Sequence, residues 1–389
     1  MAQAHFEFSP AIDISPQATA CNGDRPWATQ ARSAAATQDP TAFEIGWDHA
    51  HHRVTPPLRH LHDHNPVRQG WDAGRATFGT RTLAATAAVQ QWLALRLQAW
   101  QHGQAFEGVQ VNPHFLARIA SDDCPVSRQP LCAGPTGNAS VTRLNQAAAY
   151  AAGNLAVLSQ QVLAARGAAN WQQSLERAQR VAADQPGDGL TADDWTRLAV
   201  LTSFATPLPH AQAAMLPLRV LPPNRVRVIN PVQALQVMLT LQFTQAGYAR
   251  RLLGLAALMP GGPARQVFQI FMHTLLARRL SAGQNASLVE IRRAMEDSWA
   301  DVLVNRRWQQ LTRLLNATDC EQLLQRANQR DLVVGGGRWV SCDSATEGWA
   351  LQLEGGLAAA HRPAVGPRRA DRQARAAGTS SAQQRQLTT

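Results

Sequence analysis

The histidines between residues 49 and 64 are the densest group of side chains in this sequence that could bind a metal ion. Six of the twelve histidines lie in this stretch. His60 and His62 would share one face of an extended segment, with Asp63 beside them, and imidazole together with carboxylate suits zinc or manganese. No cysteine partner and no helical His-x-x-x-His pattern accompanies them, so the favoured interpretation is a solvated, His-rich loop.

Arginine supplies the second kind of chemistry. All 37 basic residues are Arg, the formal charge is +10, and the segment 361–389 alone contributes six Arg against one Asp. Arginine suits phosphate because its planar guanidinium donates two parallel hydrogen bonds and stays protonated. Residues 1–360 carry a charge of only +5, and a GC-rich genome would favour Arg codons in any case. The charge therefore permits a nucleic-acid partner without requiring one.

The stretch SVTRLNQAAAYAAGNLAVLSQQVLAARG stands out from the Leu-, Ala- and Gln-rich chain around it. Residues 124–132 and 139–144 flank a turn-prone AGPTGN and are predicted to pair as a β-hairpin. The apolar residues of 155–166 then recur at helical spacing, between Asn154 as the expected N-cap and Gly167 as the stop. The sequence therefore predicts a strand–loop–strand–loop–helix element.

The order of these residues resembles the ββα-metal core of HNH (His-Me finger) endonucleases. That family typically has Ser-apolar-Asp-(His or Arg)-apolar-(Asp or Asn), then Gly-Tyr-x-x-Gly-Asn-apolar, then Asn or His on the helix followed by Lys. The resemblance covers residues 124–167, a small part of the chain, and Tyr-x-x-Gly-Asn is its most specific piece. The matching residues are Ser140, Val141, Arg143, Leu144, Asn145, Tyr150, Gly153, Asn154, Leu155 and Val157.

The positions that would carry catalysis in that family have changed. The metal-binding Asp falls on Thr142, a poor ligand for a hard cation. The general-base His, where the family has one, falls on Arg143, which stays protonated and cannot accept a proton. The second metal ligand falls on Leu163, which cannot coordinate an ion. The resemblance therefore implies a degenerate site that lacks both the cation and the base of phosphodiester hydrolysis.

Two other motif positions keep a structural or binding character by the same resemblance. Asn154 matches the Asn that holds the loop against the hairpin, and Arg166 replaces a Lys. Some family members also carry two Cys-x-x-Cys zinc knuckles. Cys124 and Cys132 have no second pair of this kind, so we do not expect zinc.

Helical patterns dominate the remaining sequence, so we expect a mainly α protein with a small ββα insert and a short C-terminal β-hairpin. The hairpin would pair RDLVVGGGRWVS with GWALQLEGG. The expected organisation is an irregular N-terminal region with the His-rich loop (1–70), a helical region that contains the ββα core (71–185), a helical domain (186–355) and a disordered basic tail (356–389). Helix is predicted over 80–101, after Asn112-Pro113 and after Asn230-Pro231, and capping pairs are predicted at Thr191/Asp194, Ser287/Glu290 and Thr318/Glu321.

Bulk properties indicate the compartment. No stretch approaches the ~20 apolar residues of a membrane span, and the first residues lack a secretory signal. The five cysteines are odd in number and mostly far apart, which argues against a disulfide framework. We therefore expect a cytoplasmic protein without a membrane partner.

Three functions follow from these observations. The first is a catalytically degenerate HNH-like protein, without a cofactor, that contacts DNA or RNA through Arg128, Arg143 and Arg166. The second is a structural or protein-binding helical module. The third is an active nuclease that takes Mg or Zn ligands from the His49–His64 cluster. The changed catalytic positions favour a protein that is not an enzyme. Nucleic-acid binding also requires that the three arginines converge on one exposed surface and are not neutralised by acidic partners.

Overall fold

A computed structural model gives the fold of this chain. It describes residues 4–7, 39–134, 136–183, 188–283, 285–334, 338–341, 345–346 and 348–351. The predicted tail at 356–389 and most of the second arm of the predicted C-terminal hairpin lie outside these described residues.

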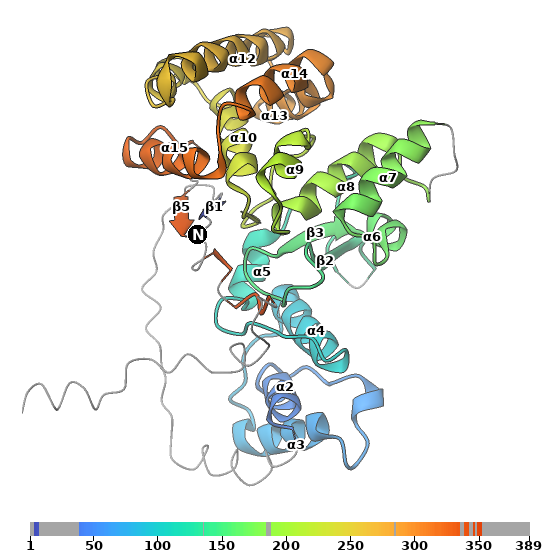
Figure 1. Ribbon diagram of the computed structural model, residues 1–389. Helices are drawn as coiled ribbons and strands as arrows, with labels where there is room; N and C mark the ends of the chain where they lie inside the picture. Colours follow the sequence, from blue (N-terminus) through green and yellow to red (C-terminus); the bar gives the residue numbers. More distant parts are fainter. Residues whose placement is uncertain are drawn as a thin grey trace, which may run out of the picture. The chain divides into compact units, whose positions relative to one another are not determined.

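The described residues are mainly helical, as predicted (Figure 1). The helices of the first half are α2 Pro40–His51, η1 Leu58–His60, α3 Pro66–Phe78, α4 Ala87–Gln101, α5 Pro113–Ile119, α6 Gln160–Arg166, α7 Trp171–Ala182 and α8 Ala192–Phe204. Those of the second half are α9 His210–Met215, α10 Pro231–Gln242, α11 Tyr248–Ala256, α12 Gly261–Ser281, α13 Leu288–Asp297, η2 Ser298–Ala300, α14 Val302–Thr312 and α15 Ala317–Gln329. The strands are β1 Ala4–Glu7, β2 Ala139–Arg143, β3 Leu155–Ser159, β4 Arg227–Val228 and β5 Arg338–Ser341.

The predicted hairpin and helix are present, but their boundaries differ from the prediction. Strand β2 pairs antiparallel with β3, in a register that runs from Ala139 opposite Ser159 to Arg143 opposite Leu155. Residues 155–159 were predicted as helix because a short apolar run fits a buried strand and a buried helix equally well, and every residue of β3 is buried. Helix α6 starts only at Gln160, so Ser159 is its N-cap and the N-cap role predicted for Asn154 is wrong.

The segment 124–132, predicted as the first strand of that hairpin, is instead a tight turn. Arg128 N donates to the Cys124 carbonyl at 2.8 Å, and Asp123 and Pro130 form an isolated bridge. Arg128 has a φ of 57°, a left-handed conformation that a regular strand does not contain. Arg128 therefore lies on a turn and not on a strand of the hairpin.

The C-terminal strand lies within the segment predicted for it, and its observed partner is the N-terminal strand. Strand β5 pairs antiparallel with β1, whose other edge pairs with β4, so the sheet order is β4-β1-β5. The N-terminal strand therefore lies between two later segments of the chain. Its residues belong to the region predicted as irregular, where no alternating pattern was long enough to predict a strand.

Helix α2 is a second correction to the irregular region 1–70. Asp39 caps it by accepting a hydrogen bond from Ala42 N at 3.0 Å, and Pro40 occupies the first turn, where the missing N–H costs nothing. Its buried face includes Phe43, Ile45 and Trp47. Pro56 and Pro57 lie beyond its end, so they limit its length rather than its formation.

Local signals located the starts of α5, α8, α10 and α13. Reciprocal capping boxes begin α8 and α13, as predicted. The box predicted at Thr318/Glu321 is wrong, because Asn316 and Asp319 form it instead. Asn230 precedes α10 without capping it, since its side chain bonds the segment that follows α8. The cap motif is thus reliable where both partners are close in sequence and no tertiary contact competes.

The described residues up to Trp349 form one compact unit. Helices α7 and α8, which lie on either side of the boundary between the predicted regions 71–185 and 186–355, pack against each other. No helix in the described part of the chain has the length and apolar character that a membrane span requires.

Two apolar clusters organise this unit. One face of the hairpin packs on α4 and α5, and the cluster consists of Leu95, Ala99, Val111, Leu116, Ile119, Val141, Tyr150, Ala152, Leu155 and Val157. In the second half, Phe271, Trp299 and Trp308 pack with ring centroids 5.5 to 5.8 Å apart. Both indole N–H groups are satisfied, by Thr240 Oγ1 and the Ala214 carbonyl.

Helices α2 and α3 touch at their backbones through two glycines. A Cβ placed on Gly46 would lie 1.9 Å from the Val67 carbonyl oxygen, and one placed on Gly70 would lie 1.9 Å from the Phe43 carbonyl oxygen. The two contacts are equivalent because each helix carries the same pattern, an apolar residue followed three positions later by Gly-Trp-Asp. The local repeat therefore forms a symmetric crossing that only glycine permits.

We expect Gly46→Ala and Gly70→Ala each to lower the free energy of unfolding by about 3 kcal/mol, because the new methyl group must push the helices apart. Gly108→Ala is the matched control, since a Cβ there meets no atom within 4 Å. It should stay within about 0.5 kcal/mol of the natural chain. Urea unfolding followed by circular dichroism measures all three, and equal stability of Gly46→Ala and Gly108→Ala would contradict the close crossing.

Candidate functional site

The loop between β2 and β3 is closed by the side chain of Asn154, which is fully buried. Its Oδ1 accepts a hydrogen bond from Asn145 N at 2.8 Å. Its Nδ2 donates to the carbonyl oxygens of Asn145 and Ala149 at 3.0 and 2.9 Å. One amide therefore satisfies three backbone groups of the loop 144–154. These groups would destabilise the loop if they were buried without a partner.

Segments far away in the sequence attach to this loop. Asn145 Nδ2 donates to the Ala205 carbonyl at 2.9 Å, and Arg227 N donates to the Gly153 carbonyl at 3.0 Å. The buried Trp349 indole donates to the Ala152 carbonyl at 2.9 Å. The Gly153 φ is 90°, and a Cβ there would collide with the Arg227 side chain. The loop 144–154 therefore joins distant segments of the fold and is not a free surface loop.

The three positions that replace catalytic residues lie on β2 and α6. Thr142 pairs with Ala156 in the hairpin and is half-buried, and Leu163 is half-buried on α6. Arg143 ends β2, and its guanidinium carbon lies 4.7 Å from the centroid of the Tyr150 ring. Its Nη1 donates to the carbonyl oxygens of Gln146 and Ala148, both at 2.9 Å. These positions present a hydroxyl, a cation and an aliphatic group, which do not fit a divalent metal ion.

A polar pocket of about 240 Å³ opens beside Arg143. It is lined by Gln98, His102, Gln104, Thr142, Arg143, Gln146 and Tyr150. The hydrogen bonds that Arg143 makes to described residues use Nη1, so its other guanidinium nitrogens are available on the pocket side. Amides, a hydroxyl and one guanidinium can hold a small anion by hydrogen bonds, but they cannot activate water.

Arg166 has an internal role. Its side chain is 2% exposed, and its Nη1 and Nη2 donate to the carbonyl oxygens of Arg143 and Leu144 at 2.9 and 2.6 Å. Burial, helped by the charge of Arg143, lowers the pKa of Arg166 to about 10, so it remains protonated at neutral pH. The cation ties α6 to the end of β2 and presents no donor to an external phosphate.

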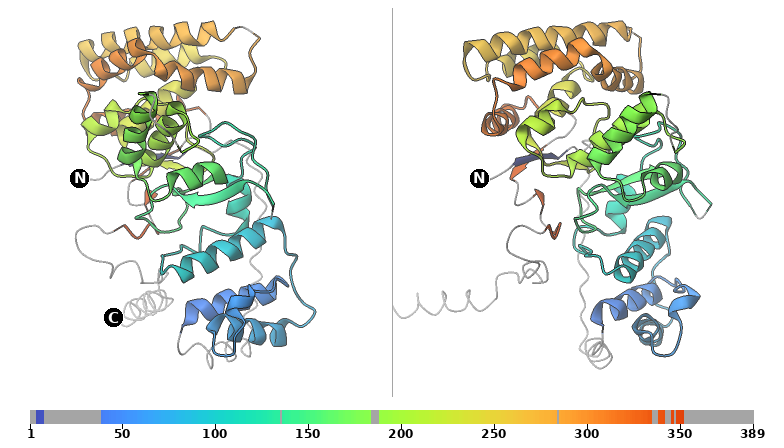
Figure 2. Two further views of the ribbon diagram at one scale, coloured as in Figure 1. Left: turned by 90° about the vertical axis from the view of Figure 1, so that its right-hand side faces the viewer. Right: turned by 45° about the vertical axis from the view of Figure 1, so that its right-hand side comes forward.

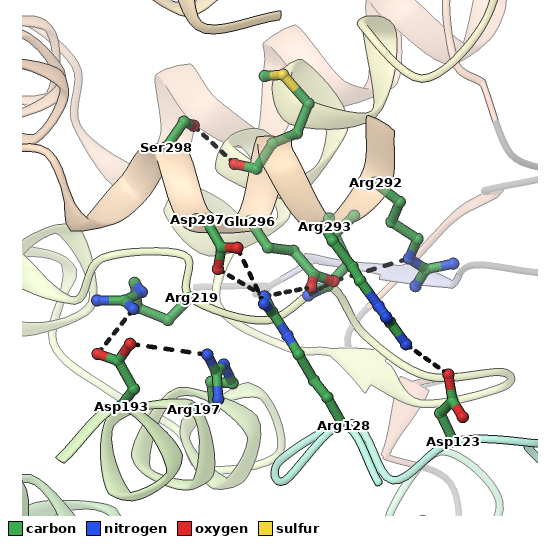
Figure 3. A network of polar contacts seen from close by, with 12 residues as sticks. Asp123, Arg128, Asp193, Arg197, Arg219, Arg292, Arg293, Glu296, Asp297 and Ser298 are labelled. Atoms are coloured by element: carbon green, nitrogen blue, oxygen red, sulfur yellow. Dashed lines mark hydrogen bonds and ion pairs between the residues drawn. The ribbon is translucent and has the colours of Figure 1, made fainter. Parts of the chain in front are cut away.

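Arg128 belongs to an ion network that joins the turn 121–129 to α8 and α13 (Figure 3). Its guanidinium donates to both carboxylate oxygens of Asp297, at 2.7 and 2.9 Å, and to Glu296 at 3.2 Å. Figure 3 shows this side chain extending from the turn to the end of α13. The further ion pairs of the network are Arg293–Asp123, Arg219–Asp193, Arg197–Asp193 and Arg292–Glu296.

The network shifts the pKa values of its two central carboxyl groups in opposite directions. Burial raises the pKa of Glu296, although the Leu221 N–H and the charges of Arg292 and Arg128 act against it. Burial also acts to raise the pKa of Asp297, but the hydrogen bond and charge of Arg128 outweigh it, so that pKa is lowered. Arg128 is thus neutralised by acidic partners.

The three predicted phosphate-binding arginines therefore do not form one exposed surface. Arg143 and Arg166 meet at the end of β2, but only Arg143 is solvent-accessible, and Arg128 is directed to α13. Only Arg143 is both accessible to solvent and without an acidic partner among the described residues, so the three side chains do not form the shared surface that nucleic-acid binding requires.

The His-rich segment is partly structural. His60 is buried, and Arg59 and Gln101 contact its Nε2, whereas His62 contacts Asn65 and the Asp63 carboxylate pairs with Arg68. These side chains face different partners. Within the described residues, no group of three or more His, Cys, Asp or Glu side chains is placed to hold a metal ion.

His49, also in this segment, is buried in α2, and burial together with Arg96 lowers its pKa to about 4. His49 is therefore neutral at pH 7, as are most histidines held inside a packed core. Its environment is that of a core residue rather than a ligand.

Sequence reasoning missed the partners that decide these roles. Glu296 lies 168 residues from Arg128, and Trp349 lies 197 residues from Ala152. No local pattern connects residues so far apart. The signal that was available is the charge alternation in IRRAMEDSW, which places two basic and two acidic residues on one short helix.

Comparison with known proteins gives no relative for this chain: no protein-family model, no curated protein and no solved structure matches it.

We expect Asn154→Ala to lower the free energy of unfolding by about 3 kcal/mol, since it removes one hydrogen-bonding side chain from three buried backbone groups. Asn224→Ala is the control, because Asn224 is exposed and makes one long hydrogen bond, of 3.4 Å. Thermal and urea unfolding provide the comparison. A loss at Asn154 no larger than that at Asn224 would mean that the loop closes without the amide.

We expect Arg128→Leu to destabilise the chain by about 3 kcal/mol at neutral pH, because Glu296 and Asp297 lose their shared cation. Adding Glu296→Gln should restore part of the loss, and Arg118→Leu on the exposed surface should cost little.

The defect of Arg128→Leu should shrink as the pH falls. Glu296, with a raised folded-state pKa, becomes neutral, while the natural chain loses the stability that the lowered pKa of Asp297 provides above its unfolded value. Urea unfolding from pH 7 to pH 3 measures this change, because the contribution of Asp297 is lost only below its unfolded pKa, and a pH-independent defect would exclude a charge origin.

Proposed function

We propose that this chain is a non-catalytic protein in which an HNH-like ββα element serves as a structural junction of a helical, protein-binding module. The observation that carries the proposal is that two of the three motif arginines make contacts inside the chain. Arg166 is buried against backbone carbonyls, and Arg128 is neutralised by Glu296 and Asp297. Arg128 and Arg166, which would contact a nucleic acid in the other interpretation of the motif, instead make internal contacts, as expected of a scaffold.

The order of the elements supports the HNH-like part of the proposal. Two antiparallel strands are followed directly by a helix, and the Asn154 amide holds the intervening loop, which is the role of the matching family residue. Cys124 Sγ accepts a hydrogen bond from Ser159 N at 3.5 Å, so the turn after Cys124 meets the start of α6. Ser127 stands three residues after Cys124, so this cysteine has no Cys-x-x-Cys partner for a zinc knuckle.

The absence of suitable catalytic groups supports the non-catalytic part. Metal-assisted hydrolysis needs oxygen or imidazole ligands for the cation and a base for the water. Thr142 offers only a neutral hydroxyl, Arg143 stays protonated and Leu163 has no donor atom, so these positions supply neither a suitable set of ligands nor a base.

A nicking assay on supercoiled plasmid tests this directly. We expect the natural chain to leave the plasmid intact with Mg²⁺ or Mn²⁺, because no side chain at the motif can bind the ion or activate water. The triple variant Thr142→Asp, Arg143→His, Leu163→Asn is run beside it to supply the missing groups. Nicking by the natural chain that disappears with Asn154→Ala or His60→Ala would contradict the proposal and favour the nuclease alternative.

Nucleic-acid binding is a second candidate, and the pocket beside Arg143 favours it. Arg143 is the one motif arginine with donors left for a phosphate oxygen. If this candidate holds, Arg143→Ala weakens binding to labelled DNA and reduces its salt dependence by about one phosphate contact. Arg118→Ala, an exposed arginine outside the pocket, is the control. Our proposal expects the two variants to bind equally.

A further inference from the structure

Exposed apolar side chains concentrate on three neighbouring helices. Among the described residues, twelve large hydrophobic side chains are exposed, and half of them lie on α12, α13 or α14. These six are Ile270, Leu280, Leu288, Val289, Val302 and Leu303. Single exposed apolar residues need no explanation, but a concentration of this kind marks an interaction surface.

Helices α12 and α14 run antiparallel and side by side (Figures 1 and 2). The Arg278–Asp301 ion pair joins the end of α12 to the start of α14, and the Phe271 and Trp308 rings are 5.5 Å apart further along. Leu280, which is 62% exposed, and Val302, which is 81% exposed, therefore flank the same end of the helix pair.

A shallow pocket of about 460 Å³ lies at that end. Small residues from three helices line it, among them Ala282, Ala294 and Ala300. Asp297 and Asp301 also line it, but both carboxylates are already bound to arginines of this chain. The lining residues Ser281 and Asp301 are next in sequence to the exposed Leu280 and Val302, so the alanines and these two side chains together suit an aliphatic or aromatic side chain of a partner better than a cation.

The surroundings of this face are basic. Residues 261–313 contain eight Arg against four acidic residues. Arg306 and Arg313 are exposed on and just after α14, and within the described part of the chain neither has an ion pair. Arg306 follows Val302 by four residues and Arg313 follows Arg306 by seven, which places the three side chains on one stripe of the helix.

This combination selects one class of partner. A nucleic acid would leave Leu280 and Val302 facing its phosphates, whereas a protein partner can bury them. A second copy would bring this basic face against itself, and like charges oppose such contact. We infer that the end of the α12–α14 pair binds an acidic amphipathic helix of a partner protein, with an apolar side chain in the pocket and carboxylates beside Arg306 and Arg313. The inference deepens the proposed protein-binding role and rests on it.

The probe is a fluorescein-labelled synthetic helix of about five turns with Leu on one face and Glu on the other. A peptide of the same composition in scrambled order is the control. With the full chain, fluorescence anisotropy should show saturable binding of the ordered peptide and about tenfold weaker binding of the scrambled one.

Substitutions locate the binding face. Val302→Glu, Leu280→Glu and Arg306→Glu should each weaken binding about tenfold, and Arg306→Glu should also reduce its dependence on salt. The matched controls are Leu58→Glu, at a residue 87% exposed on η1, and Arg118→Glu, at an exposed arginine of α5; both should bind as the natural chain does. Circular dichroism melting checks that each variant is folded.

Three results would overturn the inference. The first is no saturable binding of the ordered peptide, or equal loss in test and control variants. The second is single-stranded DNA that binds with the same sensitivity to Val302→Glu, which would assign the face to nucleic acid. The third is a dimer that Val302→Glu converts to a monomer in light scattering. The nicking assay and the Arg143→Ala comparison test the proposed function separately, so failure here leaves their outcome unaffected.

Discussion

The arrangement around the hairpin depends on one buried amide. Asn154 satisfies three backbone groups of the loop 144–154, and a closed loop then offers carbonyls and N–H groups at fixed positions to Arg166, Arg227 and Trp349. Backbone groups buried in a loop need a partner wherever no strand or helix provides one. The loop can be a junction of distant segments only because its own polar groups are already paired.

Two of the three motif arginines in the described part of the chain act as internal donors. A buried guanidinium needs several acceptors to offset its desolvation, and carbonyl oxygens of Arg143 and Leu144 supply them for Arg166. Arg128 gains a bidentate carboxylate instead. A basic composition is therefore a poor guide to phosphate binding here, because the number of arginines says nothing about how many donors remain on the surface.

How far the sequence predicts the structure depends on the distance over which each feature is determined. The helices α8 and α13, with their capping residues, follow from signals within four positions, and they are as expected. The apolar run at 155–159 was assigned to the wrong element because its strand partner, not its own pattern, decides its conformation. The site was only partly predictable for the same reason. The pairing of Asn154 with Asn145 lies within the motif, whereas the acidic partners of Arg128 lie on a helix that no local pattern connects to it.

Helix α13 links the two proposed roles physically. It presents Glu296 and Asp297 to Arg128 on one side, and Ala294, Asp297 and Ser298 line the pocket at the end of the α12–α14 pair. Association costs less when the binding face is already ordered, because less side-chain and loop entropy is lost. An ion network that fixes the end of α13 against the turn at Arg128 would supply such order. For a scaffold, the same network that withdraws Arg128 from external ligands then contributes to binding by holding the partner face rigid.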